Sequence, residues 1–417
     1  MEKTELHPFR QQFPALTHKV YFNFGGQGPM SHETMTAIAN SFAHIQSKGP
    51  FSRQTNDWVR EECHLTRTTI SSALGVEPTT ISLTEDVSVG CNIVLWGLDW
   101  QAGDHLLMTD CEHPGIIAAI QELQRRMGLE VTICPISQTL NQPHTHQAIL
   151  ELVQKHLRPR TRLVVLSHIF WNTGQVLPLD KIIDLCHSQA TPVRVLVDAA
   201  QSVGMIPLNL TQLGVDFYAF TGHKWWCGPE GLGGLYVSPE ARERLSPTFI
   251  GWRNLIADPQ GNPVGWQPHG QRYEIATSAY PLYAGLRESL NIHNRWGTDE
   301  NRYQRILSLS RHLWQQLQTL PTVRCVQNQS PQSGLVSLQL LSQQPSTQSH
   351  AEFVQVLEDQ GILIRAIPNP NCVRVSIHYF TLESEINTLV RAIARWSTPD
   401  PRAISFPREP KDGRFLG

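Results

Sequence analysis

Three short polar segments each follow an apolar run, and they hold the side chains best suited to chemistry. These side chains are Asp198, Lys224 and His113, which come after the apolar runs 195–197, 217–220 and 105–108. At the carboxyl ends of strands, a carboxylate, an amine and an imidazole would lie where open α/β sheets bind ligands. A desolvated lysine has a lowered pKa and can act as a nucleophile or a base.

Each of these residues also has a structural interpretation. Alone, Asp198 is equally well explained as a solvated turn residue, and Lys224 is better explained as a strand-end lysine that extends to solvent. A lone His113 could be a base, a metal ligand or a stacking ring, and is more often structural. No HExxH motif exists, and the His144–His146 pair lies among Asn, Gln, Pro and Thr, so we predict no metal site. The glycine-rich stretch 228–234 precedes a strand and opens no helix, so it is no dinucleotide motif.

The segments that would position these residues alternate between strand and helix patterns. We expect strands at 105–108, 130–134, 163–166 and 193–197, and helices at 116–127, 146–156 and 179–188. This alternation predicts an α/β fold with a mainly parallel sheet. Strands at 217–220 and 234–237 leave little room for a helix between them, so we expect one edge of the sheet to be antiparallel or mixed.

The segment before this alternation, 31–98, is expected to be mostly helical. Ser31 can cap a helix over 32–46, and Gly75 can end a second helix that follows Asn56.

The character of the chain changes after residue 279, where we expect a smaller α+β domain. Its expected helices are 280–320, interrupted near Gly297, 352–359 and 383–396, and its expected strands are 335–341 and 373–377. We therefore divide the chain into an N-terminal segment (1–20) that packs on the small domain, a large domain (21–285), a small domain (286–398) and an extended, proline-rich tail (399–417).

The composition excludes several classes of protein. The 417 residues include 34 Lys and Arg against 36 Asp and Glu, which disfavours a nucleic-acid-binding module. No apolar run is long enough to span a membrane, and the N-terminus is unlike a signal peptide. The eight cysteines form no CxxC pair, which disfavours a disulfide framework or a zinc site. We expect a soluble, cytoplasmic enzyme.

The order and spacing of these motifs resemble the class V aminotransferase family. The most specific pattern is Asp198-Ala199-Ala200-Gln201 followed, about twenty residues later, by Thr221-Gly222-His223-Lys224, and the resemblance extends from Asn23 to Arg374. The resemblance implies a pyridoxal-phosphate (PLP) enzyme of fold type I, the aspartate-aminotransferase fold, in a family that includes the cysteine desulfurases.

The resemblance also implies a role for individual residues. Lys224 resembles the lysine that binds PLP covalently, and Asp198 the partner of the pyridine nitrogen. His113 resembles the ring stacked on the pyridine, and Gln201 the donor to the phenolic oxygen. The family pattern further implies contacts to the phosphate from Val87, Ser88, Thr221 and His223.

Substrate and subunit contacts follow from the same resemblance. Arg374 resembles the arginine that binds the substrate carboxylate, with Gly26 and Arg365 beside it. Thr277 resembles a residue that contacts the cofactor of the neighbouring subunit, which implies a homodimer with shared sites. Asn172 is expected at the cofactor and substrate, although the family places its asparagine one position earlier, where Trp171 stands.

One departure from the desulfurase pattern bears on the reaction. Desulfurases carry a persulfide-forming cysteine on a loop before the carboxylate-binding arginine, whereas the stretch 364–371 has two prolines and no cysteine. Cys372 stands two residues before Arg374, inside or entering a strand, where a structural thiol is expected.

A site with the electron sink but without the acceptor thiol favours β-elimination. A persulfide leaves more readily than a thiolate, so the resemblance implies a carbon–sulfur lyase that cleaves cystine, and cysteine more weakly, to pyruvate, ammonia and a persulfide or sulfide. It also implies sulfur supply to an acceptor protein for iron–sulfur clusters. A cysteine or selenocysteine desulfurase, an aminotransferase or epimerase, and a non-catalytic scaffold remain alternatives. For Trp225, Trp252 and Tyr280 we expect core packing in most cases.

Overall fold

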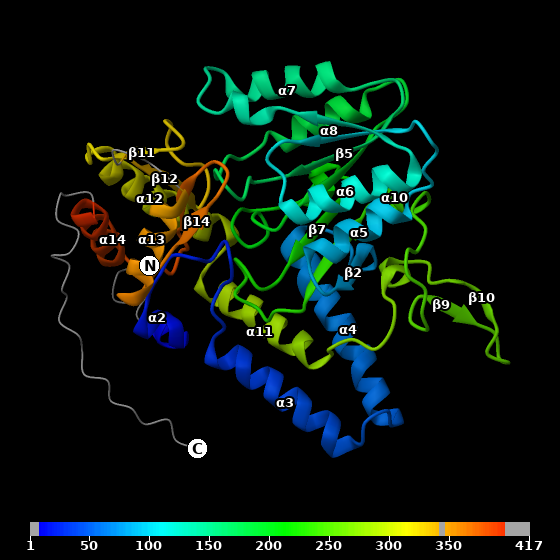
Figure 1. The fold of residues 1–417 in the computed structure, drawn as a ribbon. Coiled ribbons are helices and arrows are strands. Elements are labelled where there is room, and N and C mark those ends of the chain that lie inside the picture. The colour runs from blue at the N-terminus through cyan, green and yellow to red at the C-terminus, as the bar shows by residue number, and fades with distance from the viewer. Residues whose placement is uncertain (1–7, 342–346, 397–417) are drawn as a thin grey trace.

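A seven-stranded sheet between two layers of helices forms the larger part of the computed structural model, which describes residues 8–341 and 347–396 (Figure 1). The strand order is β2-β8-β7-β6-β5-β3-β4. Strands β3 to β7 run parallel, whereas β8 is antiparallel to its neighbours β7 and β2, so the predicted mixed edge is confirmed. The strands are β2 (Ile81–Thr84), β3 (His105–Thr109), β4 (Glu130–Cys134), β5 (Thr161–Ser167), β6 (Arg194–Asp198), β7 (Phe217–Thr221) and β8 (Gly233–Val237).

Alternate side chains of these buried strands enter two apolar cores, one on each face of the sheet. Leu106 and Met108 pack in the core that includes α5 and α6, whereas Leu107 packs in the core that includes α4, α7 and α8. Successive residues of a strand point to opposite faces, so a strand buried on both sides is apolar throughout. The helices are α4 (Arg53–Leu74), α5 (Val87–Gly97), α6 (Pro114–Met127), α7 (Thr145–His156) and α8 (Leu179–His187).

The N-terminal helices begin and end at residues that the sequence identifies. Helix α3 (His32–Lys48) is capped by Ser31, whose side chain accepts a hydrogen bond from the Thr34 amide, and α4 ends at Gly75 with φ of +66°, so both predictions are confirmed. The expectation that 31–98 is mostly helical misses β2. That strand has four residues, all buried, and a run so short carries no readable period.

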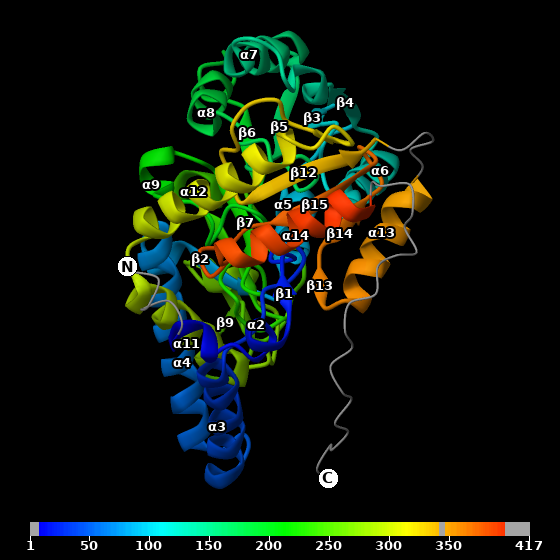
Figure 2. The same cartoon turned by 90° about the vertical axis from the view of Figure 1, so that its left-hand side faces the viewer.

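The smaller part of the molecule is an antiparallel four-stranded sheet in the order β11-β12-β15-β14 (Figure 2). Its strands are β11 (Val323–Cys325), β12 (Leu335–Leu340), β14 (Arg365–Ile367) and β15 (Cys372–Ser376). They share a core with α12 (Asp299–Gln318), α13 (Thr347–Asp359) and α14 (Glu383–Trp396). Helix α11 (Pro281–Trp296) precedes α12, and Gly297 separates them as predicted.

The N-terminal residues contact this smaller part. Strand β1 (Val20–Tyr21) pairs with β13 (Ile362–Leu363), and the Arg10 guanidinium lies 2.7 Å from a carboxylate oxygen of Glu385 on α14. The domain boundaries stay a prediction. The proposed tail at 399–417 and residues 1–7 lie outside the described residues.

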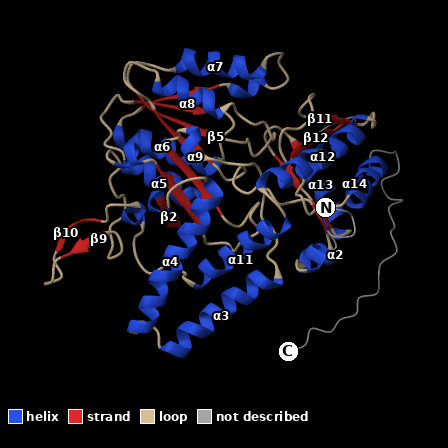
Figure 3. Ribbon diagram, turned by 180° about the vertical axis from the view of Figure 1, so that it is seen from behind, coloured by secondary structure: helices blue, strands red, loops and turns tan. Residues whose placement is uncertain are grey.

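A hairpin of β9 (Leu255–Ala257) and β10 (Pro263–Trp266) projects from the larger part and was not predicted (Figures 1 and 3). Val264 on this hairpin is 63% exposed. Trp252 is 58% exposed, so the expected core packing is wrong for this residue, whereas Trp225 is fully buried as expected. Short helices α2 (Pro14–His18), α9 (Leu210–Leu213) and α10 (Pro239–Arg242) complete the fold. In the described ranges, no helix combines the length and apolarity that crossing a membrane would require.

Candidate active site

Lys224, Asp198 and His113 line one cavity of about 170 Å³, at the carboxyl ends of β7, β6 and β3. Parallel strands bring their carboxyl ends to one edge of the sheet, which explains why residues far apart in the sequence meet here. The remaining lining residues are Asp86, Val87, Ser88, Ser167, Ile169, Trp171, Ala200, Gln201 and His223.

Lys224 is the amine of the cavity. Burial lowers the pKa of its ammonium from 10.5 to about 8, and the nearby Asp198 carboxylate partly opposes this shift. A lysine in this range provides a substantial fraction of free amine near neutral pH, and a free amine can attack an aldehyde or accept a proton.

Asp198 ends β6 and is buried. Burial raises the pKa of its carboxyl group, while the Ala200 amide donates to Oδ1 at 2.9 Å and Lys224 favours the charged form. A buried carboxylate with one backbone donor can accept a second, positively charged donor, such as a protonated ring nitrogen.

His113 is the N-cap residue of α6, and its Nδ1 accepts a hydrogen bond from the Gly115 amide at 3.2 Å. That bond fixes the imidazole at the cavity wall, where its centroid lies 5.5 Å from the Trp171 ring. Desolvation lowers the pKa of His113, with Asp198 acting in the opposite direction. The ring is thus available to stack on a flat ligand.

The N-terminus of α5 lies at the end of the cavity where an anion would bind. The Asp86 side chain accepts a hydrogen bond from the Val89 amide at 2.9 Å, and the amides of Val87 and Ser88 precede any intrahelical partner. Free amides at a helix N-terminus bind phosphate. His223 also lines the cavity, and its Nδ1 lies 2.6 Å from the Thr221 hydroxyl.

Gln201 joins the cavity to the N-terminal glycine segment. Its Nε2 donates to the Gly25 carbonyl at 2.9 Å, and its Oε1 accepts from the Trp225 indole at 2.9 Å. These two partners orient the amide and leave one N–H of Nε2 for a ligand oxygen.

Arg374 is buried on β15 with only part of its guanidinium satisfied. One terminal nitrogen donates to the Trp171 carbonyl at 2.7 Å, whereas Nε and the other terminal nitrogen have no partner among the described residues. Burial lowers its pKa to about 9, and Arg365 adds to that effect. Gly25 lies beside the free nitrogen, since a Cβ there would be 3.1 Å from it. A buried guanidinium with two unpartnered nitrogens suits a carboxylate.

Several predicted residues, Arg374 and Thr221 among them, do not line the cavity around Lys224. Asn172 donates to the Asn369 carbonyl at 2.9 Å and borders a separate cavity, while its neighbour Trp171 lines the cavity that contains Lys224. Thr277 is exposed before α11, and Arg365 is exposed on β14, opposite Arg374. Gly26 donates its amide to the Asn23 carbonyl at 2.9 Å.

Glu112 was not predicted, and it is hydrogen-bonded to Ser167 in the wall of the cavity. Its carboxylate accepts hydrogen bonds from the Thr109 hydroxyl and from both the amide and the hydroxyl of Ser167, and burial raises its pKa to about 8. The only available signal was its position next to His113, because a polar segment does not reveal which carboxylate faces inward.

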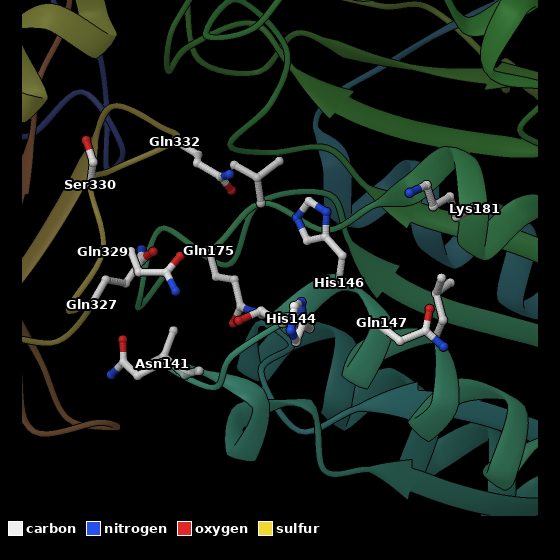
Figure 4. Close-up of a pocket in the computed structure, with 14 residues that line it drawn as sticks. Asn141, His144, His146, Gln147, Gln175, Lys181, Gln327, Gln329, Ser330 and Gln332 are labelled. Atoms are coloured by element: carbon white, nitrogen blue, oxygen red, sulfur yellow. The ribbon is translucent and has the colours of Figure 1, made fainter.

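Another cavity, of about 430 Å³, is shown in Figure 4, and Lys224 is not among its lining residues. It is lined by His144, His146, Lys181 and several amide side chains. Within the described ranges, no three His, Cys, Asp or Glu side chains are grouped so as to hold a metal ion.

The cavity around Lys224 fits PLP. The helix terminus at Val87 suits the phosphate, Lys224 the aldehyde, Asp198 the ring nitrogen and His113 the ring face. The fold and this site define a fold type I PLP-dependent enzyme. The chain belongs to the class V aminotransferase family, whose profile matches residues 20–397.

Two similar solved structures are of the cystine C–S lyase C-DES. One holds its reaction product cysteine persulfide, is 46% identical with a TM-score of 0.88, and aligns over 92% of this chain and 99% of the lyase. The other, a variant with glycine covalently linked to the PLP cofactor, is also 46% identical, with a TM-score of 0.89 over 92% of this chain and 98% of that one.

Relatives with other reported activities align at lower identity. A probable cysteine desulfurase of Mycolicibacterium paratuberculosis is 30% identical over 315 residues, which are 72% of this chain and 43% of that protein, so the aligned region spans less than half of that relative. Isopenicillin N epimerase of Streptomyces clavuligerus is 26% identical over 390 residues, 90% of this chain and 94% of the epimerase.

Proposed function

We propose that this protein is a carbon–sulfur lyase that acts on L-cystine, and more weakly on L-cysteine, by β-elimination. The observation that carries this proposal is that the segment before Arg374 has no accessible cysteine. Strands β14 and β15 pair from Arg365↔Arg374 to Ile367↔Cys372, so only residues 368–371 connect them, and none is a cysteine. Cys372 itself is buried, and burial raises its thiol pKa to about 12, which disfavours a nucleophilic thiolate.

The proposed roles of the residues follow from the geometry. Arg374 binds the substrate carboxylate with its two unpartnered nitrogens. Lys224 would hold PLP through its amine, and the same amine could move the Cα proton of the substrate. Asp198 would hold a proton on the ring nitrogen, and His113 would cover a face of the ring. When bound, PLP supplies the electron sink for Cα deprotonation.

The products leave according to the strength of their conjugate acids. Cystine releases cysteine persulfide, which leaves more readily than the sulfide released from cysteine. The other half of the molecule is hydrolysed by one water, so that its carbon skeleton becomes pyruvate and its nitrogen becomes ammonia. Similarity to C-DES at 46% identity supports cystine as the substrate. We further propose that the persulfide sulfur reaches an acceptor protein for iron–sulfur cluster assembly.

The test is an incubation of the PLP-loaded protein with L-cystine, without reductant or keto acid, followed by assays of pyruvate and sulfane sulfur. We expect both products, their loss in Lys224→Ala, and their retention in Cys372→Ser. In the parallel reaction with L-cysteine and reductant, alanine without pyruvate would instead identify a desulfurase. Exchange of the Cα proton with inversion of the configuration at Cα, but without pyruvate, would instead favour an epimerase. The isopenicillin N epimerase described above aligns with this chain over 94% of its own length.

A homodimer with shared sites is the second part of the proposal. Exposed apolar side chains gather near the β9–β10 hairpin, in the same region of the chain as Thr277. They are Phe249, Ile250, Trp252, Ile256, Val264, Trp266 and Ile275. Apolar surface of this extent favours a protein partner, and a second copy would bring Thr277 to the neighbouring cofactor. Trp252→Ser with Trp266→Ser should then yield monomers in sedimentation velocity.

A further inference from the structure

The turn that carries Lys224 is held through every one of its carbonyl groups from His223 to Trp226. The Gly28 amide donates to the His223 carbonyl at 2.7 Å, and the Cys227 amide donates to the Lys224 carbonyl at 3.0 Å. These two bonds come from the glycine segment and from the turn itself.

Side chains from distant parts of the chain hold the other two carbonyls. His378 Nε2 donates to the Trp225 carbonyl at 3.1 Å. His293 Nε2 donates to the Trp226 carbonyl at 2.7 Å, and the Ser289 hydroxyl donates to the same oxygen. His293 and Ser289 belong to α11, whereas His378 follows β15.

The hydrogen-bond partners define the tautomer of His378. A carbonyl only accepts, so Nε2 carries the proton, and Nδ1 accepts from the Phe380 amide at 3.4 Å. His378 is fully buried, which places its pKa well below the ordinary value and keeps the ring neutral. The Phe24 ring stacks on it, with centroids 4.4 Å apart and planes 13° apart.

His378 stands four residues after Arg374 on the extension of the same strand. The strand that presents the carboxylate-binding guanidinium is therefore bonded directly to the residue after Lys224. The two groups that must act on one substrate come from different sheets, and this bond joins those sheets next to the site.

We infer that His378 is a positioning residue: by holding the Trp225 carbonyl, it sets the orientation of Lys224 relative to Arg374. His293 and Ser289 hold the opposite end of the turn from α11. This inference rests on the proposed function of Lys224 as the residue that binds PLP. It predicts that loss of the bond between His378 and the Trp225 carbonyl changes the behaviour of the Lys224 amine, and not substrate binding alone.

The experiment compares His378→Phe, which keeps a stacking ring without the donor, with His378→Gln, which keeps a donor without the ring. His350→Gln is the matched control, because His350 is a buried histidine of the smaller part that bonds to the Leu340 amide and to Asn371. The PLP-loaded proteins are compared by the pH midpoint of the visible PLP band, by kcat and KM for cystine, and by thermal unfolding.

We expect His378→Phe to shift the pH midpoint of the band and to lower kcat about tenfold or more, with KM within about threefold, because a misplaced reacting group affects the chemical step. His378→Gln should recover most of both. An unchanged midpoint and kcat in His378→Phe, with no more than the lower unfolding temperature also seen in His350→Gln, would overturn the inference, and so would a loss in His378→Gln as large as that in His378→Phe. If His378→Phe does not fold, Ser289→Ala tests the other end of the turn, and an unchanged midpoint and kcat in that variant would overturn the inference. The band titration needs no substrate, so it decides the inference even if cystine yields no pyruvate.

Discussion

Replacing Arg374 by methionine should lower the activity strongly and stabilise the fold at the same time. The guanidinium is 1% exposed, yet Nε and one terminal nitrogen have no partner among the described residues, so the free enzyme keeps an incompletely paired charge inside. Methionine fills most of the same volume and requires no hydrogen bond.

The expected size follows from the contacts. Each unsatisfied buried donor costs about 1–3 kcal/mol, whereas the bond to the Trp171 carbonyl that would be lost contributes about 1 kcal/mol. With two such donors, we therefore expect the free energy of unfolding to rise by about 1–5 kcal/mol in Arg374→Met. Truncating one member of a buried charge pair costs about 2–5 kcal/mol, so kcat/KM for cystine should fall by about 30-fold or more.

The pH dependence provides an independent check. Burial lowers the pKa of Arg374 to about 9, while an unfolded arginine keeps its proton to much higher pH. Above pH 9 the folded state releases this proton before the unfolded state does, so the destabilisation by Arg374 is full below pH 9 and diminishes above it. The stability difference between Arg374→Met and the wild type should therefore shrink as the pH rises above 9.

Urea unfolding of the PLP-loaded proteins at pH 7 and pH 10 measures both effects, with Arg365→Met as the control. Arg365 lies opposite Arg374 on β14 but is exposed, so its substitution should leave stability nearly unchanged. If Arg374→Met were less stable than the wild type at pH 7, the guanidinium would have structural partners and the reasoning would be wrong.

Three further predictions concern residues around the cavity. In the PLP-free protein, the rate at which Lys224 combines with PLP should rise with pH with a midpoint near pH 8. Asp198→Asn should lower that midpoint, because the carboxylate raises the pKa of Lys224, and stopped-flow rates across pH measure both effects. Gly25→Ala should raise KM roughly tenfold, since the added Cβ would lie 3.1 Å from the Arg374 guanidinium, as steady-state kinetics would test. Burial raises the pKa of Glu112 to about 8, so wild-type stability should fall relative to Glu112→Gln between pH 5 and pH 8, where only the unfolded state has lost the proton; urea titrations check this.

The convergence of Lys224, Asp198 and His113 could be predicted because all three follow strands of a parallel sheet. An apolar run identifies each strand, and the topology brings the strand ends together. Glu112 could not be assigned in the same way, since its carboxylate is buried by contacts with Thr109 and Ser167, and the latter is far away in the sequence.

Elements without a regular alternation of apolar and polar residues could not be predicted from the sequence either. Strand β2 is four residues long, and the β9–β10 hairpin is largely exposed, so neither shows the alternation of a half-buried strand. The bond between His378 and the Trp225 carbonyl joins residues more than 150 positions apart and depends on how two sheets pack. A pattern in one segment holds no information on such a contact.

The turn between β14 and β15 is held on both sides, which bears on the choice between elimination and persulfide transfer. Asn172 donates to the Asn369 carbonyl at 2.9 Å, Gln339 donates to the Asn371 carbonyl at 2.9 Å, and the Asn371 side chain bonds to His350. A thiol introduced into this turn would be fixed against those partners, whereas attack on a substrate sulfur requires a mobile thiolate. We therefore expect Asn371→Cys to keep releasing pyruvate from cystine and to form no alanine from cysteine. Alanine from this variant, measured by amino-acid analysis, would mean that a cysteine alone, without a longer loop, is enough to change the reaction.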